Sequence, residues 1–275
     1  MMKQDTWTGE RLETFITGET MQEHLHRYAI AASLAKGKKV LDIACGEGYG
    51  AMLLAKVAIQ VTAVDIDENT IRNAVSKYKA ANITFRAGSI LHIDAPDGSF
   101  DMISCLETLE HLEDHEAILK ELKRVLTPGG LLFISTPEKI NYSDKAGYKN
   151  PFHQKELTGT EFKSLLGRFF SHLDLYKQFS FLGSVILNEH PQPLTAFYKG
   201  DYDNIATIAE PETMYWLALA SDKELPLVVS GLFQSPQTSH SIKDEQTARV
   251  KKTITYRTGH FILRPFKFIY SLFRK

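Results

Sequence analysis

Residues 38–55 decide the fold, and they read KKVLDIACGEGYGAMLLA. The branched and leucine side chains at the start of this stretch are typical of a buried strand, and its alanine- and leucine-rich end is typical of a helix. Between them, the small residues from Ala44 to Gly50 allow a sharp turn and a close approach of a ligand to the backbone at the helix N-terminus. The stretch therefore predicts a strand, a ligand-binding turn and a helix.

The alternation of strands and helices continues downstream. Further strands are predicted at 59–67, 83–88, 100–107 and 130–136, and helices at 67–80 and 115–126. Strands that alternate with helices at this spacing indicate a parallel sheet covered on both faces. Beyond Pro137 the pattern predicts a helix at 158–169 and strands at 173–179 and 213–221, with an insertion at about 180–212.

Composition indicates one globular domain with appendages. The chain has 275 residues, of which 43% are hydrophobic and 24% are charged, so it can bury a sizeable core. The polar start has no apolar signal-peptide region and no stretch is apolar enough to span a bilayer, so a cytoplasmic location is expected. The two cysteines, Cys45 and Cys105, lack the spacing of metal ligands, and no metal site is predicted.

Charge is unevenly distributed along the chain. From Arg249 to the C-terminus there are eight Lys and Arg residues and no acid, which leaves 24 basic and 33 acidic residues in 1–248. Because the body is net acidic, nucleic acid is not expected as a partner. The division expected from these patterns is a helical cap at 1–35, a main domain at 36–222, and a linker with a basic tail at 223–275.

The end of the tail, residues 264–275, has the pattern of an amphipathic helix. Its apolar residues Phe266, Ile269, Tyr270 and Phe273 recur at helical spacing between basic residues. Such a segment can bind peripherally to an anionic membrane. It can equally dock on its own protein or on a second subunit, and the oligomeric state does not follow from the sequence.

Two acids near the glycine turn indicate a nucleotide-type cofactor. Asp65 ends the second predicted strand, where a carboxylate can accept hydrogen bonds from ribose hydroxyls. The glycines alone also fit the dinucleotide pattern GxGxxG/A. Asp42, placed before the turn, suits a cationic amino group and would repel a pyrophosphate, which favours S-adenosylmethionine over NAD. The simpler alternatives are a turn-capping acid for Asp42 and a helix N-cap for Asp65.

The ordered segments VLDIACGEGYG, VTAVDID, RAGSI, FDMISCLETLEHL and RVLTPGGLLFISTPE resemble the motifs of class I S-adenosylmethionine-dependent methyltransferases over roughly residues 36–180. This resemblance implies an α/β, Rossmann-like seven-stranded sheet that is mostly parallel, with the last strand antiparallel at 213–221. It also implies that S-adenosylmethionine is contacted by Asp42, Ala44, Gly46, Gly48, Asp65, Ile66, Ser89, Ile90, Leu106 and Glu107. Two positions depart from the family pattern: Ala44 replaces a glycine, a small change, and Ser89 replaces an acid that would bind the adenine amino group.

A narrower resemblance concerns the acceptor. The segments TGERL, EHLHRYAIAA, LETLEHLEDH, STPEKINYS and NPFHQKEL are similar to those of a bacterial subgroup often associated with surface-polysaccharide and lipopolysaccharide assembly. This implies O-methylation of a glycan or a lipid-linked saccharide precursor. The alternatives are methylation of a small molecule such as a quinone, a non-catalytic cofactor-binding regulator of polysaccharide assembly, and an NAD-dependent oxidoreductase.

Histidines are the candidates for assisting methyl transfer to a hydroxyl, because a neutral imidazole can accept a proton near pH 7. His111, after the fourth predicted strand, is the first candidate, and His153, on the loop after the fifth, is the second. Each can also be a residue that only shapes its loop. The helical segment 23–32 carries His24, Arg27 and Tyr28. It is expected to form a lid that turns Arg27 and Tyr28 toward the cofactor, or else to be a packing helix.

Overall fold

The computed structural model describes residues 19–179, 197–200, 205–208 and 211–228, together with the single residues 12, 231, 233 and 251. In chain order the elements are α1 (Glu19–Ala35), β1 (Lys39–Ile43), α2 (Tyr49–Ala55), β2 (Gln60–Asp65), α3 (Glu68–Lys77), β3 (Ile83–Ala87), β4 (Phe100–Leu106), the 3₁₀ turn η2 (Leu109–His111), α4 (His115–Val125), β5 (Leu126–Pro137), the π-helical turn η3 (Ile140–Asp144), α5 (Gly159–Gly167), β6 (His172–Gln178), β7 (Phe197–Gly200), β8 (Ile205–Ile208) and β9 (Tyr215–Ser221).

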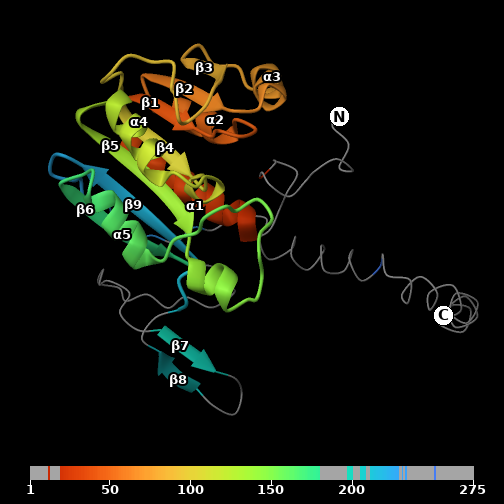
Figure 1. Ribbon diagram of the computed structural model, residues 1–275. Helices are drawn as coiled ribbons and strands as arrows, with labels where there is room; N and C mark the ends of the chain where they lie inside the picture. Colours follow the sequence, from red (N-terminus) through yellow and green to blue (C-terminus); the bar gives the residue numbers. More distant parts are fainter. Residues whose placement is uncertain are drawn as a thin grey trace, which may run out of the picture.

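Seven strands form one twisted sheet in the order β3-β2-β1-β4-β5-β9-β6 (Figure 1). β9 runs antiparallel to both β5 and β6, and the other neighbouring strands are parallel. The predicted Rossmann-like sheet with a reversed strand at 213–221 is therefore confirmed. The strand order reverses between β1 and β4, and ligands of such sheets bind outside the carboxyl ends of the strands at this point.

Helices cover both faces of the sheet (Figure 1). Alternate residues of β5 face each of the two layers. Leu132 and Ile134 pack in one core with residues of α4 and α5. Leu131 and Phe133 pack in a second core with residues of α1, α2 and α3. This alternation follows from the two-residue period of a strand, and it explains why the sheet strands are apolar almost throughout.

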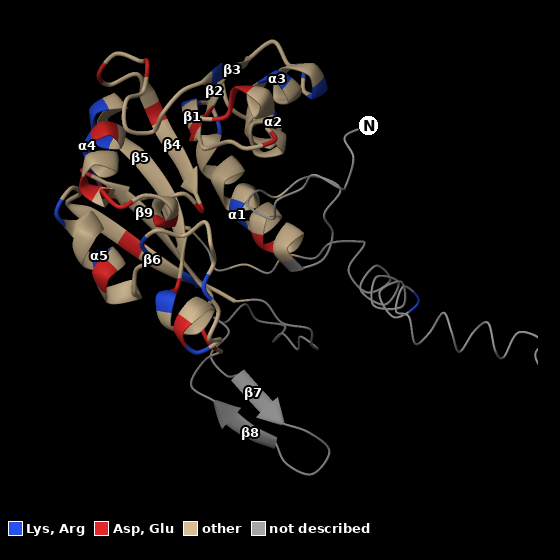
Figure 2. Ribbon diagram, turned by 45° about the vertical axis from the view of Figure 1, so that its right-hand side comes forward, with Lys and Arg blue, Asp and Glu red and all other residues tan. Residues whose placement is uncertain are grey.

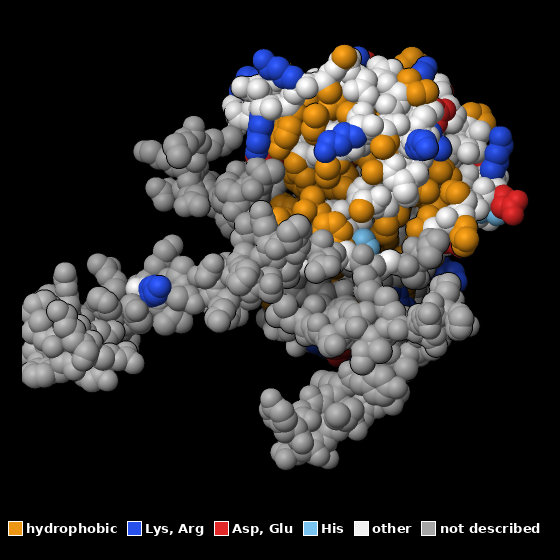
Figure 3. Space-filling model, turned by 180° about the vertical axis from the view of Figure 1, so that it is seen from behind, with side chains coloured by type: hydrophobic (Ala, Val, Ile, Leu, Met, Phe, Trp, Pro, Cys, Tyr) orange, Lys and Arg blue, Asp and Glu red, His pale blue; other side chains and the backbone are white. Residues whose placement is uncertain are grey.

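The surface of the described part carries both charges and exposed apolar groups. Figure 2 shows Lys and Arg interspersed with Asp and Glu around the sheet. Figure 3, which views the molecule from behind relative to Figure 1, shows hydrophobic side chains gathered on that face. None of the helices in the described residues combines the length and the apolar character needed to cross a membrane.

Two predicted appendages are described only in part. Within the insertion predicted at 180–212, β7 and β8 pair as a separate antiparallel sheet, which the sequence pattern did not predict. The basic segment 264–275 lies outside the described residues. The cap predicted at 1–35 is described from Glu19 onward, with Leu12 as an isolated residue, and there it forms α1.

α1 is held against α2 by a ring-on-glycine contact. The Tyr28 side chain lies over Gly50, where a Cβ atom would come within 1.9 Å of the Tyr28 Cζ. Tyr28 also meets Tyr49 edge to face, with ring centroids 5.5 Å apart. Gly50 therefore allows the predicted lid helix to approach the glycine turn.

We expect Gly50→Ala to lower the free energy of unfolding by about 1–3 kcal/mol, because the added methyl overpacks the Tyr28 contact. Urea denaturation followed by circular dichroism measures this change. Gly167→Ala is the control, since a Cβ there meets no atom within 4 Å. Equal stability of the two variants would show that Tyr28 does not hold α1 in place.

Candidate active site

The glycine turn after β1 adopts left-handed backbone at three positions. Ala44, Gly46 and Gly48 have φ values of 56°, 53° and 90°. A Cβ at Gly48 would lie 2.8 Å from Cε1 of Phe85, so glycine is required there by both conformation and space. Ala44 differs little in size from the glycine of the family pattern, but its positive φ costs about 1–2 kcal/mol for a residue with a Cβ.

Asp65 joins the turn to the second strand. One carboxylate oxygen accepts a hydrogen bond from the Gly46 amide at 2.9 Å, and the other accepts one from the Asp67 amide at 3.0 Å. Each carboxylate oxygen has two lone pairs, so further donors such as ribose hydroxyls can be bound. The alternative of a helix N-cap belongs to Asp67 instead, whose side chain caps α3.

The expected adenine side of the site lies at the ends of β2 and β3. The Gly88 amide donates to the Asp65 carbonyl at 2.9 Å, which brings the two strand ends together. Ile66 is 72% exposed, unusual for isoleucine and suitable for contact with a planar base. Ile90 is buried and Ser89 accepts a hydrogen bond from the Leu91 amide, so both shape the neighbouring turn.

Asp42 is buried at the end of β1 beneath Tyr28. The Tyr28 hydroxyl lies 3.3 Å from each of the Asp42 carboxylate oxygens and donates to this group. Burial raises the pKa of Asp42 to about 7, with a smaller effect of the nearby Asp65. Tyr28 and Asp42, both predicted as cofactor contacts, are thus brought into one pair.

Arg27 connects α1 to the end of β4. Its buried guanidinium donates from Nε to Gln178 Oε1 at 2.7 Å, and Nη1 lies 3.6 Å from Glu107 Oε1. The group also stacks on Tyr215, 4.3 Å from the ring centroid. The pairing of this buried cation with the Glu107 carboxylate and the Tyr215 ring explains why α1 can carry a charge on the face that packs against the sheet.

Glu107 directly follows Leu106 and has a left-handed φ of 50°. Its carboxylate accepts a hydrogen bond from the Ser135 hydroxyl at 2.6 Å. The strained backbone turns this carboxylate back over β5, where the family resemblance places the sulfonium. His24, on α1, instead faces Tyr49 at 3.0 Å, and burial lowers its pKa to about 3, so it is neutral.

The two candidate histidines lie side by side. The rings of His111 and His153 meet edge to face with centroids 5.2 Å apart. The loop that carries His153 is fastened to η2, since the amides of Gln154 and Lys155 both donate to the Glu110 carbonyl. The structure thus places together two residues that are 42 positions apart in the sequence.

Hydrogen bonds define the tautomers of both rings. His111 Nδ1 lies 3.0 Å from the Phe152 carbonyl, which can only accept, so this nitrogen carries the proton and Nε2 of the neutral ring carries the lone pair. In His153, Nδ1 donates to Glu156 Oε1 at 2.5 Å, and Nε2 accepts from the Asn150 amide at 3.0 Å. His111 is therefore the better placed of the two to accept a proton from an acceptor.

The buried carboxyl of Glu110, which lies beside the two histidines, was not predicted from the sequence. Glu110 is 1% exposed, accepts from the Thr136 hydroxyl at 3.3 Å, and has Oε1 3.9 Å from His111 Nε2. Burial, together with the charge of Glu107, raises the pKa of Glu110 well above its usual value. The position of Glu110 next to His111 in LETLEHL was the one sequence signal for it. Nothing in the sequence pattern indicated that Asn150 and Glu156 would bond to His153.

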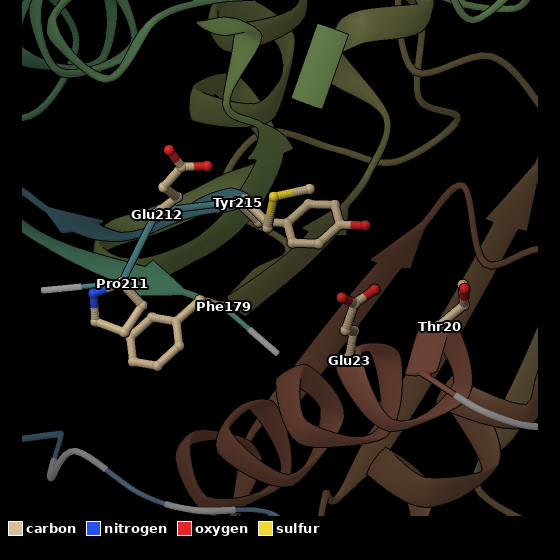
Figure 4. A pocket seen from close by; sticks show the side chains of 7 residues that line it. Thr20, Glu23, Phe179, Pro211, Glu212 and Tyr215 are labelled. Atoms are coloured by element: carbon tan, nitrogen blue, oxygen red, sulfur yellow. The ribbon is translucent and has the colours of Figure 1, made fainter. Parts of the chain in front are cut away.

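A cavity of about 410 Å³ lies between α1 and the start of β9. Figure 4 shows Thr20 and Glu23 on α1, Glu212 before β9, Tyr215 at the start of β9, and Phe179 after β6. Pro211 and Met214 complete the lining. The volume suits a small ligand or one sugar unit. Tyr215 links this cavity to Arg27 and, through Tyr142 at 6.0 Å between ring centroids, to the face of His153.

Known proteins share sequence with the part of the chain that forms most of the sheet. Residues 41–134 match the family described as a methyltransferase domain. Probable S-adenosylmethionine-dependent methyltransferases of Mycolicibacterium smegmatis and Mycobacterium tuberculosis are each 37% identical over 58% of this chain, and the matches span 62% and 59% of their own lengths. A ubiquinone biosynthesis O-methyltransferase of Xanthomonas campestris is 36% identical over 40% of this chain and 47% of its own length.

Solved structures share the fold at low sequence identity. The YcgJ protein of Bacillus subtilis is 17% identical, with a TM-score of 0.53 over 73% of this chain and all of its own. A SAM-dependent methyltransferase of Thermotoga maritima gives the same identity and TM-score over 74% of this chain and 91% of its own. The sheet-forming part of the chain has the fold of these methyltransferases, and the match of residues 41–134 to the methyltransferase domain family supports S-adenosylmethionine as the cofactor.

We expect Asp65→Ala to weaken binding of S-adenosylhomocysteine by about 1–3 kcal/mol, because hydrogen bonds to a charged group are lost and the turn loses its anchor. Calorimetric titration measures the change. Asp67→Asn is the matched control, as asparagine also caps a helix. If affinity stayed the same in Asp65→Ala, the carboxylate would have no part in cofactor binding.

The pKa of Asp42 predicts a pH dependence of cofactor affinity. The cationic amino group favours the carboxylate form, so binding should strengthen as the pH rises through about 7 and weaken as it falls below this value. We expect the Kd for S-adenosylhomocysteine to be roughly tenfold higher at pH 6 than at pH 8. Asp42→Asn should abolish this difference, and an unchanged profile in that variant would assign the dependence to another group.

Proposed function

We propose that this protein transfers the methyl group of S-adenosylmethionine to a hydroxyl oxygen of a glycan or of a lipid-linked saccharide precursor. The observation that supports this acceptor is the cavity between α1 and β9, which lies at the same edge of the sheet as the cofactor-binding turn. Its lining combines carboxylates with aromatic rings.

This lining suits a neutral polyhydroxylated ring. The carboxylates of Glu23 and Glu212 can accept hydrogen bonds from hydroxyl groups. Phe179 and Tyr215 offer apolar surface for the C–H face of a sugar. Glu23 lies in the cavity wall with its side chain largely buried, so a negatively charged acceptor would be repelled there.

The transfer is an in-line displacement at the methyl carbon. The acceptor oxygen forms a bond to this carbon as the bond to sulfur breaks, and the sulfur keeps the electron pair, which gives a methyl ether and S-adenosylhomocysteine. Positioning of the two reactants supplies much of the rate enhancement. We assign assistance in removing the hydroxyl proton to the Nε2 lone pair of His111, with His153 orienting the neighbouring loop.

A small-molecule acceptor is the second candidate. The similarity to ubiquinone biosynthesis O-methyltransferases of Xanthomonas favours it, since those proteins are named for a quinone pathway. A phenolic hydroxyl would use the same aromatic lining of the cavity. The composition of residues 264–275 favours the lipid-linked saccharide proposed first, because its aromatic residues and its Lys and Arg residues suit the anionic membrane surface where such an acceptor is held.

The transfer assay uses S-adenosylmethionine with a labelled methyl group and separate pools of lipid-linked saccharides, free glycans and quinols. We expect label in the saccharide pools, in a bond stable to mild base as a methyl ether would be. Label in quinols alone would replace the proposed acceptor with the small-molecule one. Binding of S-adenosylhomocysteine without transfer to any pool would indicate a cofactor-binding regulator, and binding of NADH alone would indicate an oxidoreductase.

His111→Ala tests the assigned chemistry in the same assay. We expect turnover to fall by about 10²–10⁴-fold, the usual contribution of a positioned proton acceptor, with cofactor affinity unchanged. His172→Ala, at an exposed position on β6, is the control for loss of a histidine. Equal turnover of His111→Ala and the unaltered protein would remove His111 from the reaction.

A further inference from the structure

Glu110, His111 and His153 bring three ligand-type groups together, and Tyr142 lies between His153 and the cavity residue Tyr215. One carboxylate oxygen and one nitrogen from each ring lie within 4.8 Å of one another. Two imidazoles and one carboxylate form a common ligand set for divalent ions such as Zn²⁺, with a further coordination position left for water or substrate. No sequence pattern indicated this set, because His153 is 42 positions away from His111. The hydrogen bonds that join the loop carrying His153 to η2 bring the three residues together.

Both rings have the outer hydrogen bonds that orient metal-bound histidines. His111 donates from Nδ1 to the Phe152 carbonyl, and His153 donates from Nδ1 to the Glu156 carboxylate. Carbonyl and carboxylate acceptors on the far ring nitrogen set the tautomer and the ring direction of a ligand. Glu156 is itself held by the Ser143 hydroxyl at 2.8 Å. As a result, Nε2 is the basic nitrogen in each of the two rings.

The third proposed ligand, Glu110, is also oriented by a hydrogen bond from a neighbouring side chain. Glu110 accepts from the Thr136 hydroxyl at Oε2, and Oε1 is the oxygen nearer to His111 Nε2. The carboxyl is almost fully buried, and buried carboxylates in proteins are hydrogen-bonded, paired with a cation or bound to a metal. Tyr142 stacks on His153 with ring centroids 5.6 Å apart, which shields one side of the cluster from water.

We propose that Glu110, His111 and His153 bind a divalent cation of the zinc type, and that the acceptor hydroxyl occupies its open coordination position. Ligand atoms at about 2.0–2.2 Å from such an ion lie about 3–4 Å apart, so the side chains close inward by about 1 Å on binding. The Asn150 amide, which donates to His153 Nε2 at 3.0 Å, is displaced by the ion.

The chemical role rests on the proposed function, whereas binding of the ion does not. A coordinated hydroxyl loses its proton to water more readily, and the resulting alkoxide attacks the methyl carbon as the C–S bond breaks. The His111 lone pair that we assigned to proton removal then serves as a ligand, and the ion takes over the acidifying role. Loss of His111 would lower turnover in either case, so the ion must be tested by binding.

The test is titration of the metal-stripped full-length protein with Zn²⁺ in competition with a chromophoric chelator, without cofactor or acceptor. We expect one equivalent to bind, and we expect His153→Ala and Glu110→Gln each to weaken binding at least about tenfold. His172→Ala should bind as the unaltered protein does. Titration with Co²⁺ should give visible absorption bands of a low-coordinate site that are lost in His153→Ala.

Asn150→Asp is a variant that should strengthen Zn²⁺ binding instead of weakening it. It keeps the oxygen that accepts from the Phe152 amide but removes the donor that competes for His153 Nε2, so Zn²⁺ affinity should rise at least about threefold. Circular dichroism and S-adenosylhomocysteine binding check that each variant is folded. Equal Zn²⁺ affinity in the unaltered protein, His153→Ala and Asn150→Asp would overturn the proposal, while methyl transfer could still be found in the acceptor assay.

Discussion

The hydrogen bonds of the Asp65 carboxylate are the interaction on which the glycine turn and the neighbouring strand ends depend. The carboxylate accepts from the Gly46 amide on one oxygen and from the Asp67 amide on the other. One side chain at the end of β2 thereby fixes both the turn that leaves β1 and the start of α3. Because hydrogen bonds to a charged group are strong and directional, the turn is shaped before any ligand arrives.

Backbone strain is confined to the same edge of the sheet. Among the described residues, the two with a side chain and a positive φ are Ala44 and Glu107, and they follow β1 and β4, the strands at which the order reverses. Each costs on the order of 1–3 kcal/mol and persists only where the surroundings hold it. The Ser135 hydroxyl holds Glu107, and the Cys45 amide, bonded to the Val64 carbonyl at 3.0 Å, holds the turn after Ala44.

α1 closes this edge through contacts with partners far away in the sequence. Tyr28 reaches Asp42, while Arg27 reaches both Gln178 and Glu107. These contacts join the N-terminal helix to β1, β6 and the end of β4 at once. The cavity that we propose for the acceptor lies between this helix and β9, so the helix contributes to both halves of the site.

The amino-acid sequence by itself determined the alternation of strands and helices, the reversed strand at 213–221, the glycine turn and the acids at Asp42 and Asp65. These features are local, since each depends on side-chain period, turn chemistry or the end of one strand. The tertiary structure decided the strain at Ala44, the place of Gly50 under Tyr28, and the meeting of His111 with His153 and Glu110. These three features depend on which loops bond to one another across the sheet. A sequence pattern does not give the distances between residues that are far apart in the chain.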